Sequence, residues 1–439
     1  MNMMNQGELL ALDRRHVWHP FTQELTASAP IPMVRAHAAS LYSQDGQEYL
    51  DMISSWWVIN HGHTHPMIAA AIAQQAATLE QVIFAGCTHP KAVELAVTLA
   101  NHLPQGLERV FFSDNGSTAV EIALKMARQF WHNQGKTRNR FLAFAGGYHG
   151  ETVGAMSASR STGFFAAFES MLFPVDMLPY PATWEQDDAL ESKEAEALAA
   201  LEAYLERYGD SCAAVILEPL IQGASGMRMC RPEFLQKFCH LVRQAHILII
   251  FDEVMTGFGR SGTLFALEQV GITPDLLALS KGLTGGFMPL AVTVCQPHVY
   301  EAFLGQTFST ALAHGHSFTA NPLGCAAALA SLNLFTTENT MARVVAIEAI
   351  HRERLGGLQG STKVLHGRVQ GSVAALEIRG IDPHYGSDRG GWLKNFFLKR
   401  AILIRPLGNV FYLLPPFCTS AQQLHRAWDV LEEALESGL

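Results

Sequence analysis

Residues 249–260 read IIFDEVMTGFGR, and this stretch decides the fold. The apolar run 247–251 that leads into it is short and continuous, as in a strand that is buried on both faces of a sheet. Such a strand delivers Asp252 to its carboxyl end, which is where open α/β sheets bind their ligands. We therefore expect Asp252 to face a ligand site.

A second stretch repeats this arrangement further along the chain. Residues 276–279 (LLAL) form another short apolar run, and Lys281 follows at its carboxyl end, before a glycine-rich turn at 282–286 (GLTGG). A carboxylate and a lysine at the carboxyl ends of two such strands could face one another across a single ligand.

Pyridoxal 5'-phosphate (PLP) is a cofactor that needs this pair of side chains. A carboxylate beside its pyridine nitrogen keeps the nitrogen protonated, so that the ring can accept electrons. A lysine amine can bind its aldehyde carbon and can later carry a proton. Each residue alone has a plainer interpretation. Asp252 could simply be a polar residue that ends a strand, and Lys281 could be a surface residue. Together, each at a strand end and flanked by glycine, they favour a catalytic site.

The phosphate group of PLP also needs a binding site, which gives an independent test of the PLP hypothesis. Residues 112–121 (FSDNGSTAVE) read as a strand, a turn of small residues and the start of a helix. Free N–H groups and hydroxyls at a helix N-terminus bind phosphate, and the helix dipole adds roughly 0.3–1 kcal/mol. The alternative is an ordinary helix cap by Asn115 or Ser117. The GxxxxGK[ST] phosphate loop does not occur in the chain.

The motif GGYHG at 146–150 follows a further strand candidate. An aromatic or imidazole ring at this place could stack on a flat cofactor. Taken alone, the motif is equally compatible with a turn that packs an aromatic side chain.

Short apolar runs recur through the middle of the chain and alternate with helical stretches such as 118–131 and 232–244. This alternation predicts an α/β fold with a mainly parallel central sheet and helices on both faces. The runs are 110–112, 140–145, 213–217, 247–251, 276–279 and 290–295.

The two ends of the chain have a different pattern. Residues 33–55 are broken by the turn 44–46 (QDG) and predict a small antiparallel sheet, while 421–435 predicts a final amphipathic helix. We expect the first ten or so residues to be frayed and the glycine-rich stretch 356–371 to be irregular.

Composition excludes several other classes of function. The formal net charge is -9, and we find no basic run of the kind that follows a nucleic-acid backbone. No stretch approaches the roughly 20 apolar residues that span a membrane, and the polar start of the chain lacks the apolar core of a signal peptide. The seven cysteines are scattered without a CxxC pair, as in a reducing compartment. We expect a cytoplasmic protein with small-molecule substrates and neither a nucleic-acid nor a membrane partner.

Three alternating histidines, His61, His63 and His65, are the one candidate for a metal site. On a strand they would share a face, but no nearby cysteine or carboxylate completes a ligand set. We therefore predict no metal.

With these motifs in view, the chain resembles the class III (fold type I) PLP-dependent aminotransferases. Within that class it is most similar to the adenosylmethionine-8-amino-7-oxononanoate aminotransferases of biotin synthesis. The resemblance runs from about residue 14 to the C-terminus. Its markers are 18–22 (WHPFT), 54–57 (SSWW), 114–117 (DNGS), 147–150 (GYHG), 252–253 (DE), Lys281, 314–317 (HGHS) and 405–408 (RPLG).

The resemblance implies a fold type I architecture and a homodimer whose active sites are shared between subunits. A large PLP-binding domain would cover residues 60–330. A smaller α+β domain would form from residues 1–59 and 331–439.

The resemblance also implies the cofactor contacts. Lys281 would hold PLP and relay the proton, Asp252 would pair with the ring nitrogen, and Tyr148 would stack on one ring face. Further cofactor contacts would come from Val254 on the other face, from Gly116 and Ser117 at the phosphate, from His316, and from Ser317 across the subunit boundary.

The substrate pocket implied by the resemblance has an aromatic wall and one arginine. Its residues would be Phe21, Trp56, Trp57, Tyr148, Gly315, Arg405 and Tyr412. A nine-carbon keto acid with an apolar middle and one charged end suits such a slot, with Arg405 holding the carboxylate. The plainer alternatives are core packing for the two tryptophans and a surface position for Arg405.

The predicted reaction is the transamination of 8-amino-7-oxononanoate to 7,8-diaminononanoate with S-adenosylmethionine as amino donor. Two residues differ from those of relatives that use S-adenosylmethionine as amino donor. Phe21 stands where those relatives carry Tyr, and Glu151 stands where they carry Asp. The stretch 314–318 is similar to relatives that use lysine as donor. Lysine as donor, another class III ω-amino-acid aminotransferase, an NAD-dependent dehydrogenase and a non-catalytic PLP-binding module are the alternatives.

Overall fold

Seven strands form the central sheet in the computed structural model, which describes residues 4–159, 165–383 and 388–437. Their order across the sheet is β4-β12-β11-β10-β7-β5-β6. Neighbouring strands run parallel except at the two pairs that involve β12, so the predicted mainly parallel sheet is confirmed. The strands are β4 (Arg109–Ser113), β5 (Arg140–Phe144), β6 (Asp176–Leu178), β7 (Cys212–Leu217), β10 (Leu248–Asp252), β11 (Leu276–Leu279) and β12 (Ala291–Cys295).

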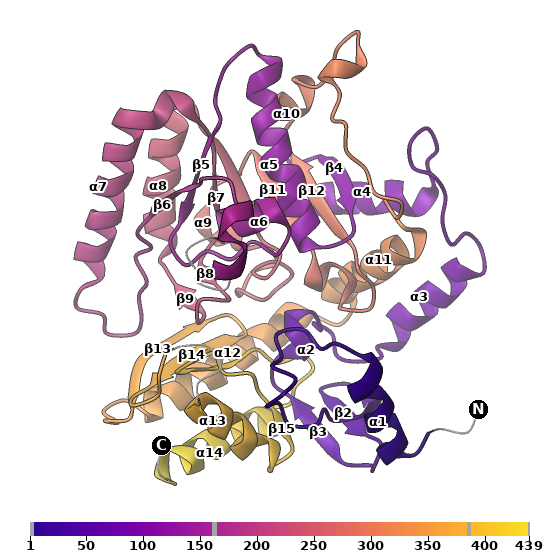
Figure 1. Cartoon of the computed structure of the whole chain (residues 1–439), viewed down its shortest axis with the longest axis vertical. Helices are drawn as coiled ribbons and strands as arrows, with labels where there is room; N and C mark the ends of the chain where they lie inside the picture. The colour runs from indigo at the N-terminus through magenta and orange to yellow at the C-terminus, as the bar shows by residue number, and fades with distance from the viewer. Residues whose placement is uncertain (1–3, 160–164, 384–387, 438–439) are drawn as a thin grey trace.

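Helices cover both faces of this sheet (Figure 1). Alternate residues of the buried strands pack against helices on opposite faces. On one face, α5 (Gly116–Asn133) shares a core with Ile250 and Ala278. On the other face, α8 (Pro232–Gln244) shares a core with Phe251 and Leu277. This double burial explains why the strands are continuous apolar runs rather than alternating ones.

The N- and C-terminal segments lie together below the central sheet in Figure 1. The predicted antiparallel sheet at 33–55 is present as β1 (Met33–His37), β2 (Ser40–Ser43) and β3 (Glu48–Asp51). Strand β15 (Ile402–Leu403), from the other end of the chain, extends it in parallel to β3. A second small sheet contains β13 (Val364–Gln370), β14 (Val373–Ile378) and β16 (Val410–Leu413).

Two expectations for the chain ends are wrong. Residues 6–16 are not frayed but form helix α1 (Gln6–His16), because the side chain of Asn5 caps its first turn. The stretch 356–371 is not irregular throughout, because it contains β13. A Cβ at Gly367 would lie 2.7 Å from Leu355, so this glycine serves close packing inside a strand rather than a loop.

The remaining helices cover the sheets and connect the two halves of the molecule. The division into domains at residues 59/60 and 330/331 stays a prediction, and the second boundary falls inside α11. These helices are α2 (Ser54–Trp57), α3 (Pro66–Ala76), α4 (Pro90–His102), α6 (Val153–Ala158), α7 (Leu190–Tyr208), α9 (Ala266–Val270), α10 (Pro297–Glu301), α11 (Pro322–Thr337), α12 (Thr340–Gly357), α13 (Asp388–Leu398) and α14 (Ala421–Glu436).

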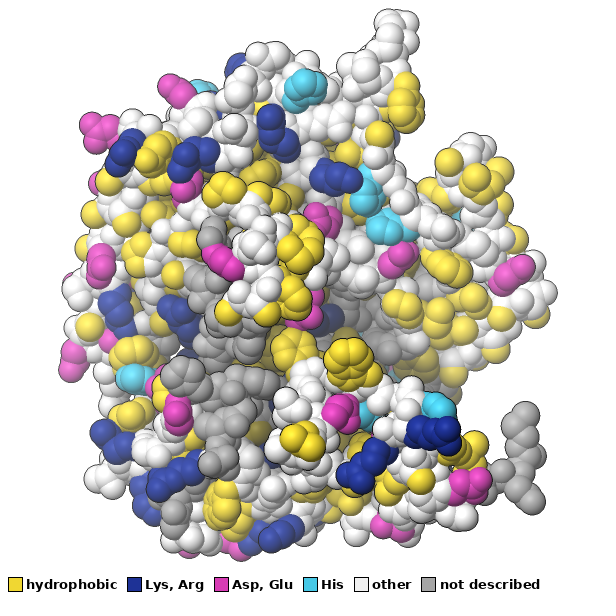
Figure 2. Space-filling model, viewed as in Figure 1, with side chains coloured by type: hydrophobic (Ala, Val, Ile, Leu, Met, Phe, Trp, Pro, Cys, Tyr) yellow, Lys and Arg dark blue, Asp and Glu magenta, His cyan; other side chains and the backbone are white. Residues whose placement is uncertain are grey.

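Large apolar side chains stay at the surface over α3 and the segment that follows it, where Figure 2 shows them gathered. They include Met67 and Ile83, which are 55% and 69% exposed. Phe318 is 61% exposed and follows Ser317, whose backbone oxygen accepts from Gln81 of the same segment. Exposed apolar side chains that gather in one patch commonly mark an interaction site. Within the described ranges, no helix is both long and apolar enough to cross a membrane.

Candidate active site

Adjacent parallel strands bring Asp252 and Lys281 to the same edge of the sheet. Asp252 ends β10 and is paired in register with Ala278 of β11. Lys281 begins the short 3-10 helix η4 (Lys281–Thr284), two residues beyond the end of β11. Burial lowers the pKa of Lys281, although the nearby charges of Asp252 and Glu218 oppose this effect. A lowered pKa leaves more of the amine neutral, which is the nucleophilic form.

Both side chains line one cavity of about 450 Å³. This volume is within the range of small-molecule sites. The structure brings every predicted cofactor residue from 116 to 281 to this cavity. They are Gly116, Ser117, Tyr148, Val254, Asp252 and Lys281.

The N-terminus of α5 forms one wall of this cavity. The side chain of Asn115 accepts a hydrogen bond from the backbone of Thr118, so the plainer interpretation as a capped helix is also correct. Gly116 has a local reason to be glycine, because a Cβ there would lie 2.6 Å from a methyl carbon of Val254. The Ser117 hydroxyl accepts hydrogen bonds from the backbone N–H groups of Glu151 and Thr152, at 3.0 and 2.9 Å. The cap is thus present in the turn that is predicted to bind the phosphate, and phosphate binding by Gly116 and Ser117 stays a prediction.

The carboxylate of Asp252 is held from two sides. The Nδ1 atom of His149 lies 2.8 Å from its Oδ2, and the backbone N–H of Val254 donates to its Oδ1 at 3.0 Å. His149 and Asp252 are both buried. The sequence allowed an imidazole at this place to stack on the cofactor, but the structure uses it to orient the carboxylate.

Glu218 is a buried carboxylate of the site that the sequence analysis missed. Its Oε1 accepts from the backbone of Tyr148 at 2.9 Å and its Oε2 accepts from the backbone of Gly223 at 3.0 Å. The pKa of Glu218 is raised to about 7, chiefly by burial; His149 opposes this shift and the charge of Asp252 contributes to it. The residue follows β7 directly, so the same rule that found Asp252 at the end of β10 could have found it.

A second cavity of about 200 Å³ adjoins the first and shares Trp57, Tyr148 and Lys281 with it. It contains every predicted substrate residue except Gly315. Its lining is Phe21, Trp56, Trp57, Tyr148, Ala224, Lys281, Arg405, Leu407 and Tyr412.

Aromatic rings and one guanidinium shape this second cavity. The Cζ atom of Arg405 lies 4.0 Å from the ring centroid of Trp56, which is a cation–π distance. Phe21 meets Trp56 edge to face at 5.8 Å. Trp57 donates from Nε1 to the hydroxyl of Tyr412 at 3.1 Å, and its ring centroid lies 5.0 Å from Nζ of Lys281. Arg405 is thus directed into a shared aromatic slot.

Tyr148 connects the two cavities. Its hydroxyl donates to Oε1 of Glu151 at 3.0 Å. Burial and the charge of Glu151 raise the pKa of Tyr148, so the hydroxyl keeps its proton across the physiological range.

The two tryptophans stand on a strained segment. Ser54, Ser55 and Trp57 have φ values of 49°, 62° and 67°, in the left-handed region that side chains other than glycine rarely adopt. Each such residue costs of order 1–3 kcal/mol and persists only where the surroundings hold it.

Within one chain, residues 314–317 line neither cavity, although His316 contacts Asp114, which lines the first. Lys125, His314, His316 and Asp114 form a chain of polar contacts, and the backbone oxygen of Ser317 accepts from Gln81. The predicted contacts of Gly315, His316 and Ser317 with cofactor or substrate stay predictions.

The three alternating histidines point to separate partners. His61 contacts Ser331 at 3.2 Å, His63 contacts Asp51 at 2.9 Å and His65 contacts Glu338 at 3.0 Å. They are structural side chains, each paired within the fold.

Residues 257–262 (GFGRSG) match the glycine spacing GxGxxG but not its structural setting. They form turns between β10 and α9, which begins only at Ala266. Arg260, inside this stretch, is fully buried and donates to the backbone oxygen of Pro415 at 2.7 Å. The stretch therefore does not open a helix onto a dinucleotide.

A mainly parallel sheet that presents a buried lysine and a carboxylate to one cavity, beside a helix N-terminus, is the arrangement of the PLP-dependent enzymes of fold type I. The chain belongs to the class-III aminotransferases, whose family model matches residues 22–435. Its cofactor is pyridoxal 5'-phosphate.

Relatives and solved structures agree with this class. The chain is 51% identical to the adenosylmethionine-8-amino-7-oxononanoate aminotransferase of Synechococcus elongatus, over 96% of this chain and 98% of that protein. It is 39% identical to the enzyme of that name from Geobacter sulfurreducens, over 97% and 96%. The crystal structure of the enzyme of that name from Methanocaldococcus jannaschii superposes with a TM-score of 0.89 at 31% identity, covering 99% of both chains. A PLP-bound amine transaminase from an uncultivated Pseudomonas species gives a TM-score of 0.89 at 30% identity, covering 95% of this chain and 97% of that one.

The raised pKa of Glu218 predicts a pH-dependent stability. Because the folded protein binds this proton more tightly than the unfolded chain, the contribution of Glu218 is greatest below pH 4.5 and is lost as the pH rises through about 7. Glu218→Gln loses the hydrogen bond from Gly223 at every pH but cannot ionise. The melting temperature of the variant, relative to the wild type, should therefore rise between these two pH values, as measured by circular dichroism. A difference that is independent of pH would contradict the assigned ionisation.

Proposed function

We propose that this aminotransferase converts 8-amino-7-oxononanoate to 7,8-diaminononanoate in biotin synthesis. The observation that carries the proposal is the aromatic cavity that leads from Lys281 to Arg405. Relatives named for this reaction, 51% identical over nearly the whole chain, support the same substrate.

The acceptor has the shape and charge of the second cavity. Its carboxylate would pair with the guanidinium of Arg405, whose planar fork suits bidentate binding. Its apolar chain would lie between Trp56, Trp57 and Phe21. Its keto carbon would then reach the cavity shared with Lys281. A small or strongly polar substrate would leave the aromatic walls unused, which ranks an ω-amino-acid aminotransferase second.

The residues of the first cavity fit PLP. Asp252 would hold the ring nitrogen, Gly116 and Ser117 the phosphate, and Tyr148 and Val254 the two ring faces, while Lys281 would bind the aldehyde carbon. When bound, PLP supplies that carbon for amine exchange and a ring that accepts electrons.

The chain's own residues supply positioning and proton transfer. With its pKa lowered by burial, the amine of Lys281 would take the proton from the substrate carbon and pass it on to the aldehyde carbon that PLP supplies. In the second half-reaction the proton would move in the opposite direction. His149 and the backbone of Val254 fix both oxygens of Asp252, so its charge stays directed at one place. These catalytic groups argue against a non-catalytic PLP-binding module.

The proposed amino donor is S-adenosylmethionine, with lysine as the alternative. The names of the relatives favour the former. Phe21 lines the substrate cavity and has no hydroxyl group. Glu151 accepts a hydrogen bond from the hydroxyl of Tyr148, which lines the same cavity. Both residues that differ from the adenosylmethionine-using relatives therefore lie where the enzyme would distinguish one amino donor from another.

A homodimer in the cytoplasm is the proposed setting. The exposed side chains of Met67, Ile83 and Phe318 give a second copy an apolar surface to cover. Gln81 ties the 78–89 segment to Ser317, so this surface adjoins the residues expected to reach a neighbouring active site. All seven cysteines lie in the described ranges as free thiols, which supports a reducing compartment.

A half-reaction tests the acceptor without assuming a donor. Wild-type enzyme carrying PLP, mixed with 7,8-diaminononanoate, should convert its cofactor to the amino form, followed by visible absorption. Lys281→Ala should fail to convert it, because the proton carrier is gone, whereas Lys237→Ala, an exposed lysine on α8, should behave as the wild type. An unchanged wild-type spectrum would refute the proposed substrate but not the class.

Arg405→Met should raise the KM for 8-amino-7-oxononanoate by about 100-fold, because an acceptor carboxylate would be left without its charged partner. Arg207→Met, an exposed arginine on α7, is the matched control. Steady-state kinetics measure the effect, and an unchanged KM in Arg405→Met would place the substrate carboxylate elsewhere.

A further inference from the structure

The wall of the substrate cavity depends on a short segment that the sheet does not hold. Trp56 and Trp57 belong to α2, in which Ser55 has φ 62° and ψ -84° and Trp56 has φ -136° and ψ 61°. Neither pair of angles is helical, and no glycine relieves the segment. Something outside the segment must therefore fix its conformation.

The carboxylate of Asp51 binds the backbone of this segment. Its Oδ2 accepts a hydrogen bond from the backbone N–H of Ser55 at 2.6 Å, and its Oδ1 accepts from the backbone N–H of Ile53 at 3.1 Å. Asp51 is fully buried at the end of β3. Hydrogen bonds to a buried carboxylate are stronger than those between neutral groups, so they can offset backbone strain.

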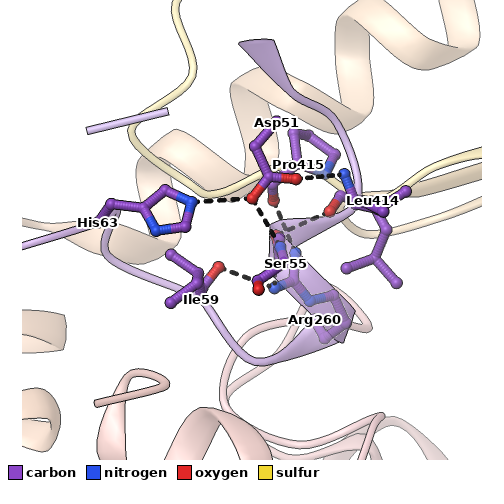
Figure 3. A network of polar contacts seen from close by, with 9 residues as sticks. Asp51, Ser55, Ile59, His63, Arg260, Leu414 and Pro415 are labelled. Atoms are coloured by element: carbon purple, nitrogen blue, oxygen red, sulfur yellow. Dashed lines mark hydrogen bonds and ion pairs between the residues drawn. The ribbon is translucent and has the colours of Figure 1, made fainter. Parts of the chain in front are cut away.

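His63 holds that carboxylate from the other side. Its Nε2 donates to Oδ2 of Asp51 at 2.9 Å, and Figure 3 shows the imidazole and the backbone of Ser55 converging on the same carboxylate. His63 is itself held by paired backbone hydrogen bonds with Ala38, next to the sheet that carries β3. The imidazole thus ties the carboxylate to the rigid part of this half of the molecule.

A buried cation, the guanidinium of Arg260, also acts on the carboxylate of Asp51. The guanidinium lies close to Asp51 in Figure 3. Within the described residues its hydrogen bonds go to neutral oxygens, those of Ser54, Ile59, Asn60, Ser372 and Pro415. Burial lowers the pKa of Arg260 to about 9, and the charge of Asp51 counteracts this effect. Without His63, the carboxylate would keep this buried cation and its backbone donors but would lose the imidazole that fixes its orientation.

We propose that Asp51 and His63 are positioning residues that hold segment 54–57 and so set where Trp56 and Trp57 meet the acceptor. Neither residue lines either cavity. The pair acts through the backbone of Ser55, and the feature that it controls is the fit of the substrate chain. The identity of that substrate rests on the proposed function, whereas the mechanical role of the pair does not.

His63→Leu tests the inference, since Asp51→Asn removes the countercharge of Arg260 and could prevent folding. In purified, cofactor-loaded enzyme, His63→Leu should raise the KM for 8-amino-7-oxononanoate at least about tenfold, because displacing a substrate wall by a fraction of an ångström already weakens binding. The content of cofactor should not change. His63→Gln places an amide N–H where Nε2 was and should restore the KM.

The matched control is His65→Leu. It removes another imidazole–carboxylate contact, to Glu338 at 3.0 Å, from the same stretch of chain, and it should leave the KM unchanged. An unchanged KM in His63→Leu would overturn the proposal. A loss of cofactor and of activity at constant KM would overturn it as well, because that pattern marks a general loss of folded enzyme.

A crystal structure of His63→Leu separates this inference from the proposed function. Displacement of the Ser55 backbone and of the Trp56 ring supports the positioning role, even if wild-type enzyme does not accept 8-amino-7-oxononanoate. An unmoved segment 54–57 overturns it, whatever the substrate is.

Discussion

The rest of the site depends on the buried carboxylate of Asp252 and on the hydrogen bonds that hold it at the end of a fully buried strand. A charge in this position costs several kcal/mol unless hydrogen bonds satisfy it. His149 and the backbone of Val254 meet that requirement, one on each oxygen. The same carboxylate opposes the effect of burial on Lys281, so the two charges limit each other's cost. Because β10 and β11 are parallel neighbours, both groups reach one cavity, and Lys281 does so from a turn in which its own φ is 45°.

The active site joins the two halves of the molecule. The first cavity is built almost wholly from the strand ends and helix termini of the central sheet. The second takes Phe21 and Trp56 from the N-terminal segment and Arg405 and Tyr412 from the C-terminal one. Rigid elements thus carry the residues predicted to bind the cofactor, while the chain ends supply those predicted to bind the substrate.

The sequence predicted the central sheet because its strands are buried on both faces and are therefore continuous apolar runs. It missed β6 because three residues are too few for such a pattern. Asp252 and Lys281 could be found because each follows such a run. The second cavity could be assigned only by resemblance, since nothing local in the sequence indicates that Phe21, Trp56 and Arg405 meet. Glu218 was within reach of the same strand-end rule, but the contact between His149 and Asp252 joins residues 103 positions apart and required the fold.

The central claim, that Lys281 faces the cofactor opposite Asp252, can be tested most directly by chemical attachment. Borohydride reduction of the PLP-loaded enzyme makes a lysine–cofactor bond permanent, and peptide mass spectrometry then locates it. The cofactor mass should be found on the peptide containing Lys281, and it should be absent from the digest of Lys281→Ala treated in the same way. Attachment to any other lysine, or none in the wild type, would contradict it.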